Sequence, residues 1–221
     1  LGAPDVYEGA PTPITAFLSV GSKAASFAML LRIFREGLPS MSGDWTVLFY
    51  ALSVVTMTAG NIAALTQTNI KRMLAYSAIA HAGYLLIGVV AGTPRGVAAM
   101  MIYLVVYAFM QMGAFAIVIL MRRADAAGDE LKDLSGLYSR QPVAAVAMLI
   151  FMLSLGGIPP TAGFMGKFWL FSAAIESGYV WLAVIGVLNS AVSLYYYIRI
   201  VVYMMLKNEP AGSEPRQSPA L

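Results

Sequence analysis

Long apolar runs separated by short polar breaks dominate the chain. The runs are apolar on nearly every helical face, and they approach the roughly 20 residues that an α-helix needs to cross the hydrocarbon core of a bilayer. The pattern therefore predicts an all-α, polytopic transmembrane helix bundle. We expect five uninterrupted helices, at about residues 12–34, 46–66, 73–91, 97–121 and 179–206.

One further apolar stretch, residues 142–177, is too long for a single straight crossing. Its 36 residues would extend about 54 Å as one helix, well beyond the hydrocarbon core. Glycines and prolines gather at 156–161, where they loosen the helix and remove backbone donors. Because neither half spans a bilayer alone, we predict one discontinuous helix and about six crossings in all. Broken helices mark ion or substrate sites in transporters.

The polar segments divide the chain into a membrane domain, residues 1–207, and a polar tail, residues 208–221. The tail has the composition of a linker or a disordered segment. Four basic and four acidic residues lie within 122–141, which we expect to be an exposed loop or surface helix. No signal-peptide pattern is present. The chain begins with Leu1 and not with methionine, so we expect a piece of a longer protein.

Composition excludes several classes of protein. Hydrophobic residues make up 59% of the chain and charged residues only 11%, whereas soluble domains carry about 25% charged residues. With no cysteine and one histidine, the chain cannot form a thiolate cluster, a disulfide or a two-histidine metal site by itself. We therefore expect no cofactor and no metal in this chain. The basic residues lie at segment ends, which suits lipid headgroups and not nucleic acid.

Basic residues also predict the orientation in the membrane. With six crossings, eight fall on the side of the N-terminal lead and three on the opposite side, which places both ends on the cytoplasmic face, most simply of a bacterial inner membrane. The first group is Lys71, Arg72, Arg122, Arg123, Lys132, Arg140, Lys207 and Arg216, and the second is Arg32, Arg35 and Arg95. We take Lys71 and Arg72 as topology determinants in a turn, and Arg199 as able to reach the headgroups.

Lys23 lies about midway along its expected helix. A charge at that depth costs roughly 2.5–3.5 kcal/mol, so it requires a compensating role. Ser19 and Ser26 share its face and would form a polar stripe with it. Because burial favours the neutral amine, we interpret Lys23 as an internal proton-carrying site. The alternative, a lysine that reaches the headgroups, would need a longer side chain.

Two further titratable side chains are candidates for proton transfer. Lys167 follows the helix break by six or seven residues, where freed carbonyl groups would lower the cost of its charge. It could instead lie near the far interface, which Glu176 is expected to mark. His81 shares a face with Ser77 and Tyr84, and histidine exchanges protons near neutral pH. A histidine hydrogen-bonded between packed helices explains that pattern equally well.

A polar stripe at spacings of four, formed by Tyr103, Tyr107 and Gln111, accompanies these groups. We favour hydrogen bonds between packed helices for it over an ordered water path. The two lysines and His81 would nevertheless place titratable groups on three different helices. That is the pattern of a proton relay, in which water bridges the gaps.

Three longer motifs identify a family. They are PDVYEGAPTPITAFLSVGSKAA at 4–25, TNIKRMLAYSAIAHAGYLL at 68–86 and GGIPPTAGFMGKFWLF at 156–171. In this order and spacing they resemble the subunit N family of proton-pumping NADH:quinone oxidoreductase, respiratory complex I. The resemblance covers the chain up to its tail, and its members are antiporter-like membrane subunits related to Mrp-type cation/proton antiporters.

The resemblance implies two inverted five-helix repeats among about 14 helices. This chain would hold the end of the first repeat and all of the second, with 142–177 as the second repeat's discontinuous helix. Lys23 matches the family's central lysine, Lys167 the broken-helix lysine that exchanges protons with the exit side, and His81 its hydrated axis. The first repeat's lysine and glutamate would lie upstream of Leu1, and a final helix would follow the chain.

The leading functional hypothesis is therefore a subunit of an NADH:quinone oxidoreductase that translocates protons, driven by quinone reduction elsewhere. Flavin, iron–sulfur clusters and quinone are expected in partner subunits, and the partners of this chain are other membrane subunits and the lipid bilayer. The alternatives are a subunit of an Mrp-type antiporter or membrane-bound hydrogenase, and a structural scaffold. A scaffold would leave the two midplane lysines unexplained.

Overall fold

A computed structural model describes residues 3–123 and 129–207. Across these residues the chain is almost entirely helical, and its one β-type pairing is an isolated bridge between Asn69 and Glu130. Five helical segments are long and apolar enough to cross a membrane: Thr12–Gly37, Pro39–Leu65, Ile70–Ala91, Pro94–Met121 and Val180–Leu206. The predicted all-α transmembrane bundle is confirmed.

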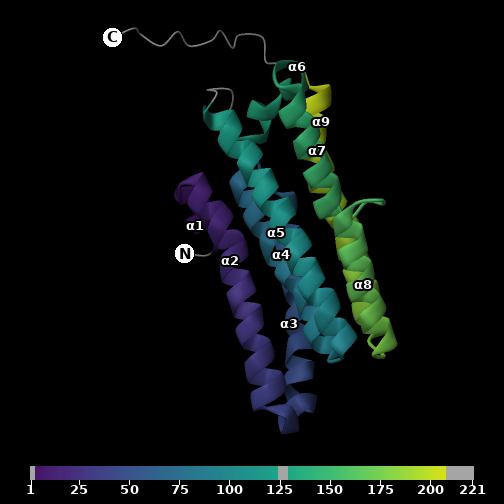
Figure 1. Ribbon diagram of the computed structural model, residues 1–221. Helices are drawn as coiled ribbons and strands as arrows, with labels where there is room; N and C mark the ends of the chain where they lie inside the picture. The colour runs from purple at the N-terminus through teal and green to yellow at the C-terminus, as the bar shows by residue number, and fades with distance from the viewer. Residues whose placement is uncertain (1–2, 124–128, 208–221) are drawn as a thin grey trace.

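The long helices run side by side along one direction (Figure 1). In chain order they are α1 (Ala3–Gly9), α2 (Thr12–Leu31), α3 (Ser42–Leu65), α4 (Ile70–Ala91), α5 (Pro94–Arg123), α6 (Leu137–Arg140), α7 (Pro142–Gly156), α8 (Ala162–Glu176) and α9 (Val180–Leu206). A π-helical turn, Arg32–Gly37, and a short 3₁₀ helix, Pro39–Met41, connect α2 to α3. Helix α4 is the most buried of the long helices and contacts α3, α5, α8 and α9.

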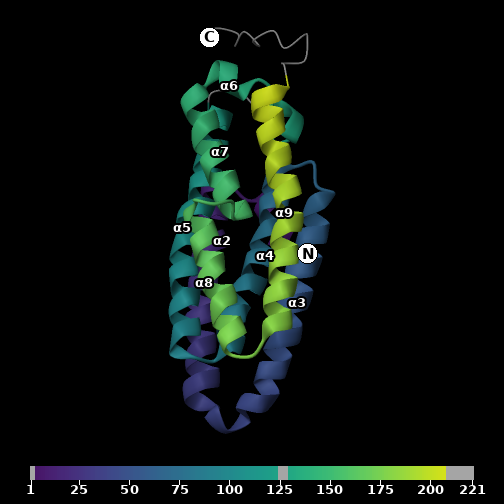
Figure 2. The same ribbon diagram turned by 90° about the vertical axis from the view of Figure 1, so that its right-hand side faces the viewer.

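Helices α7 and α8 form the discontinuous crossing. They lie end to end beside α9, and α9 contacts both (Figure 2). Helix α7 ends at Gly156, and the capping residue Gly157 has a φ of 82°, a left-handed conformation that glycine adopts without strain. Helix α8 begins after Thr161, whose hydroxyl caps it by accepting from the Phe164 amide. The predicted interruption thus lies between α7 and α8, and α7 is a shorter apolar helix beside the five long ones.

Local capping also sets the start of α4. The Asn69 side chain accepts hydrogen bonds from the Lys71 and Arg72 amides, at 2.9 and 3.1 Å, and so satisfies two of the free donors of the first turn. Helix α4 begins at Ile70, three residues before its expected start, so Lys71 and Arg72 belong to the helix and not to a connecting turn. At the other end, Gly92 stops α4 with a φ of 65°.

Ion pairs and a hydrogen bond connect α1 to the beginning of α4. Lys71 is only 2% exposed, and its Nζ donates to the Glu8 main-chain oxygen at 2.8 Å and pairs with Asp129 at 3.3 Å. Arg72 pairs with the Glu8 carboxylate at 2.9 Å. Tyr7 of α1 is buried in the same core cluster as Tyr107, and burial raises the pKa of Tyr7 to about 12. Lys71 is thus a buried structural group. Its interpretation as a turn residue did not predict this burial.

Arg199 is a second basic residue whose surroundings differ from expectation. Its guanidinium donates to the Leu65 main-chain oxygen at 3.1 Å and to the Gln67 main-chain oxygen. The end of α3 thereby meets α9, and Arg199 satisfies carbonyls at a helix C-terminus where a positive charge is favoured. The expected polar tail, residues 208–221, and the side chains of Arg122 and Arg123 lie outside the described part of the chain.

Candidate functional site

Lys167 lies directly beside the helix break. It is 3% exposed, and its Nζ donates to the carbonyl oxygens of Leu155 and Gly156, at 3.0 and 3.3 Å, and to the Ser190 hydroxyl at 2.8 Å. Leu155 and Gly156 are the last residues of α7, so the break leaves their carbonyls free to accept from the ammonium. The C-terminal end of a helix also favours a cation. Lys167 is therefore enclosed within the helix bundle.

An aromatic ring connects Lys167 to the centre of the bundle. Its Nζ lies 4.8 Å from the ring centroid of Tyr84, a distance at which the π face attracts a cation. The same Tyr84 ring meets His81 edge-on, with the two centroids 5.7 Å apart. Lys167 on α8 and His81 on α4 thus contact the same tyrosine ring.

His81 is fully enclosed by hydroxyl groups and rings. It is 1% exposed, with Nδ1 at 2.6 Å from the Tyr103 hydroxyl and Nε2 at 3.1 Å from the Tyr197 hydroxyl. Tyr197 also forms a hydrogen bond with the Ser77 hydroxyl. A neutral imidazole has one donor and one acceptor nitrogen, so these hydroxyls can hold either tautomer. The arrangement suits both packing and proton exchange.

Lys23 and Lys167 lie at the two ends of this series of contacts, with His81 between them. It is partly buried, donates to the Ser19 main-chain oxygen at 3.1 Å, and lies 5.5 Å from the Tyr107 ring centroid. The buried face of α2 passes through Ser19 to Phe27, and Ser26 is exposed. The expected polar stripe therefore contains Ser19 and Lys23 but not Ser26.

Tyr107 stands between Lys23 and His81. Its ring centroid is 4.9 Å from that of His81, and its buried hydroxyl has no hydrogen-bond partner among the described residues. The other members of the predicted α5 stripe bond to α4: Tyr103 to His81, and Gln111 to the Leu74 main-chain oxygen at 3.3 Å. Hydrogen bonds between packed helices, the interpretation that we favoured from the sequence, account for Tyr103 and Gln111 but not for Tyr107.

A buried amide cluster beside this row escaped the sequence analysis. Asn61 of α3 donates to the Asn189 side-chain oxygen at 3.1 Å and accepts from the Tyr196 hydroxyl at 2.9 Å. Asn189 in turn donates to the Thr58 hydroxyl at 3.3 Å, and Asn61 reaches the Tyr84 hydroxyl at 3.4 Å. A lone asparagine inside an apolar run was the available signal, because polar groups in membrane helices face the bundle interior.

The chain matches one family model over most of its length. The model is described as NADH:quinone oxidoreductase/Mrp antiporter, TM, and it covers residues 2–193. Over 204 residues the chain is 55% identical to "NADH-quinone oxidoreductase subunit N" of Trichlorobacter lovleyi, covering 92% of this chain and 42% of the relative. Over 220 residues it is 53% identical to the protein of the same name from Moorella thermoacetica, covering 99% and 46%. It spans less than half the length of these relatives.

Solved structures agree with this result. A chain of respiratory complex I from Thermus thermophilus is 37% identical with a TM-score of 0.78, over 94% of this chain and 45% of that one. A chain of the Mrp complex from Dietzia sp. is 26% identical with a TM-score of 0.86, over 99% and 42%. The sequence resemblance is confirmed: this chain belongs to the NADH:quinone oxidoreductase/Mrp antiporter family of transmembrane proteins.

Proposed function

We propose that the chain is the part of an NADH:quinone oxidoreductase membrane subunit that translocates protons through buried lysines and water. Quinone reduction in partner subunits, which hold the flavin, iron–sulfur clusters and quinone, supplies the driving force. The identity of 53–55% to curated subunit N proteins supports this assignment over other branches of the family. The other membrane subunits of the complex and the lipid bilayer are its partners.

One observation carries the proposal. Lys23, Tyr107, His81, Tyr84 and Lys167 follow one another through the interior, with separations of 5.5, 4.9, 5.7 and 4.8 Å between neighbouring rings and ammonium groups. The row crosses from α2 through α5 and α4 to α8. Two of its groups carry ammonium charges, which are costly in a membrane interior and mark proton or ion pathways.

Water completes this path in the proposal. The lysines approach the faces of Tyr107 and Tyr84, and a ring face cannot pass a proton on. Transfer therefore requires water molecules that bridge the ammonium groups to the hydroxyls and to His81. The hydroxyl of buried Tyr107, which has no partner in the described part of the chain, is a suitable anchor for such a water. In this scheme Lys23 is the central carrier and Lys167 exchanges protons toward the exit side.

The placement of basic residues supports the orientation predicted by their number. Lys71 and Arg72 lie in the first turn of α4, where Lys71 pairs with Asp129, and Lys207 follows α9, which contacts α6. Arg32, Arg35 and Arg95 lie at the α2–α3 and α4–α5 connections, at the other ends of α3 and α4. By the positive-inside rule the α6 end faces the cytoplasm of a bacterial inner membrane.

Replacing Lys23 with methionine tests the proposal. In the assembled complex we expect a several-fold loss of the proton flux through this chain, because methionine fills the space but cannot carry a proton. Proton uptake and NADH oxidation would be measured together in inverted membrane vesicles. Lys207→Met, at the end of α9, is the matched control and should pump normally. Unchanged pumping by an assembled Lys23→Met complex would favour the scaffold hypothesis.

An Mrp-type cation/proton antiporter subunit is the second candidate. The TM-score of 0.86 with a chain of the Mrp complex favours it, although the identity there is only 26%. Sodium separates the two functions. Proton movement that requires NADH and continues when sodium is replaced by choline supports the oxidoreductase, whereas sodium-dependent proton exchange without NADH supports the antiporter.

A further inference from the structure

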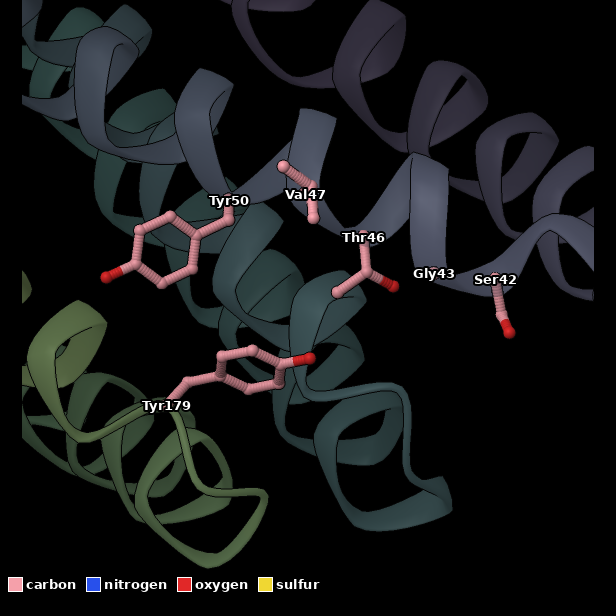
Figure 3. Close-up of a pocket in the computed structure, with 6 residues that line it drawn as sticks. All are labelled: Ser42, Gly43, Thr46, Val47, Tyr50 and Tyr179. Atoms are coloured by element: carbon pink, nitrogen blue, oxygen red, sulfur yellow. The ribbon is translucent and has the colours of Figure 1, made fainter.

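Two adjoining cavities open at the end of the bundle where α3 begins. The larger, about 410 Å³, is lined by Ser42, Gly43, Thr46, Val47, Tyr50 and Tyr179 (Figure 3). The smaller, about 280 Å³, shares Ser42, Thr46 and Tyr179 with it and adds Arg35. Together they form a pocket, here called the α3 pocket, into which serine, threonine and tyrosine side chains bring hydroxyl groups. None of these groups belongs to the row of proton-carrying residues.

Arg35 gives the α3 pocket a positive charge. Three arginines lie at this end: Arg32 pairs with Glu36 at 3.8 Å and Arg95 with Glu176 at 2.7 Å. Among the described residues, Arg35 has no carboxylate partner. A guanidinium binds phosphate oxygens through two parallel N–H donors, and hydroxyl groups donate to the same oxygens. The acidic Asp44 is in the first turn of α3, but it does not line either cavity.

An apolar track leads away from the pocket along α3. Val47, in the pocket wall, is 71% exposed, and Val55, two turns farther along the same face, is 62% exposed. Ala51 lies between them and is also exposed. The track runs from the end of the helix toward the bilayer interior. A polar pocket at the headgroup level that continues into an apolar track suits a phospholipid better than free phosphate, which would use only the pocket.

We infer that the α3 pocket binds the phosphodiester headgroup of a phospholipid, with Arg35 and the hydroxyls of Ser42, Thr46 and Tyr179 on its oxygens. One acyl chain lies along Val47, Ala51 and Val55. The lipid thereby joins the start of α3 to the α8–α9 connection, which holds Tyr179. This site requires only that the bundle lies in a membrane and does not depend on proton translocation.

Counting the lipids that remain bound tests this site. The complex that contains the chain is purified with prolonged detergent washing, and phospholipids per complex are counted by mass spectrometry. We expect the double variant Arg35→Gln/Thr46→Val to retain one phospholipid fewer than the wild type. The control Arg32→Gln, a paired arginine outside the pocket, should retain the wild-type number. Equal retention in all three proteins would overturn the assignment, as would a partner subunit found cross-linked into the pocket.

Titration of the delipidated complex separates lipid from free phosphate. Short-chain phosphatidylglycerol should bind roughly tenfold or more weakly to the double variant than to the wild type, since charge-assisted hydrogen bonds are lost. Arg35→Lys, which keeps the charge but not the two-donor geometry, should bind with intermediate affinity. Inorganic phosphate that binds as tightly as the lipid would contradict the role of the apolar track. Assembly and proton pumping, measured in parallel, show that each variant is folded.

Discussion

Replacing Lys167 with methionine is expected to stop the proton flux through this chain while the complex still assembles. Lys167 is almost fully buried, and its ammonium donates to two carbonyls and a hydroxyl at the helix break. Methionine keeps the length and the apolar contacts but has no titratable group, and Ser190 still donates to the Gly156 carbonyl at 3.1 Å. Loss of a positioned proton carrier typically costs a factor of about 100 or more. Protons taken up per NADH oxidised would be measured in inverted vesicles.

Lys167→Arg distinguishes proton exchange from a need for charge alone. Arginine retains the positive charge and the donors to the α7 carbonyls but does not deprotonate in proteins. We therefore expect Lys167→Arg to lose proton flux nearly as completely as the methionine variant. If the arginine variant pumps normally, Lys167 stabilises the helix break electrostatically and the relay must run through other groups. If methionine also pumps normally in an assembled complex, the proposed path is wrong.

The features that the sequence predicted correctly are local ones. The discontinuous helix follows from two glycines and two prolines within 156–161, since each acts on the backbone at its own position. The position of Lys167 beside freed carbonyls follows from the same break, because a helix always leaves its last carbonyls without partners. The all-α membrane fold follows from the apolar runs alone. No knowledge of which helices touch is needed for any of these.

The features that the sequence analysis missed depend on contacts between distant segments. Asn61 and Asn189 form a hydrogen bond with one another, although they are 128 positions apart in the chain. The sequence around either asparagine does not identify its partner. Lys71 looked like an exposed turn residue because its burial depends on Glu8 and on the residue at 129. Ser26 was placed beside Lys23 by helical spacing, but spacing does not tell which part of that face the neighbouring helices cover, and they bury Phe27 and not Ser26.

The close approach of α8 to α7 depends on the absence of a side chain at Gly163. A Cβ at this position would overlap the Ser154 main-chain oxygen, which cannot rotate away, and the Gly163 amide donates to the Ser154 hydroxyl at 3.0 Å. Moving α8 outward to make room would also pull Lys167 from the carbonyls of α7. The two halves of the broken helix and the hydrogen bonds of Lys167 are therefore held by the same close contact.

Gly163→Ala is accordingly expected to destabilise the chain by at least the upper end of the roughly 1–3 kcal/mol typical of overpacked sites, because backbone must shift to relieve the overlap. The measurement is the temperature at which the solubilised complex loses this chain, together with the yield of assembled complex. Gly9→Ala is the matched control, since a Cβ at Gly9 meets nothing within 4 Å. If both variants assemble and melt like the wild type, the α7–α8 contact is looser than the structure has it, and the hydrogen bonds of Lys167 to Leu155 and Gly156 lose their structural basis.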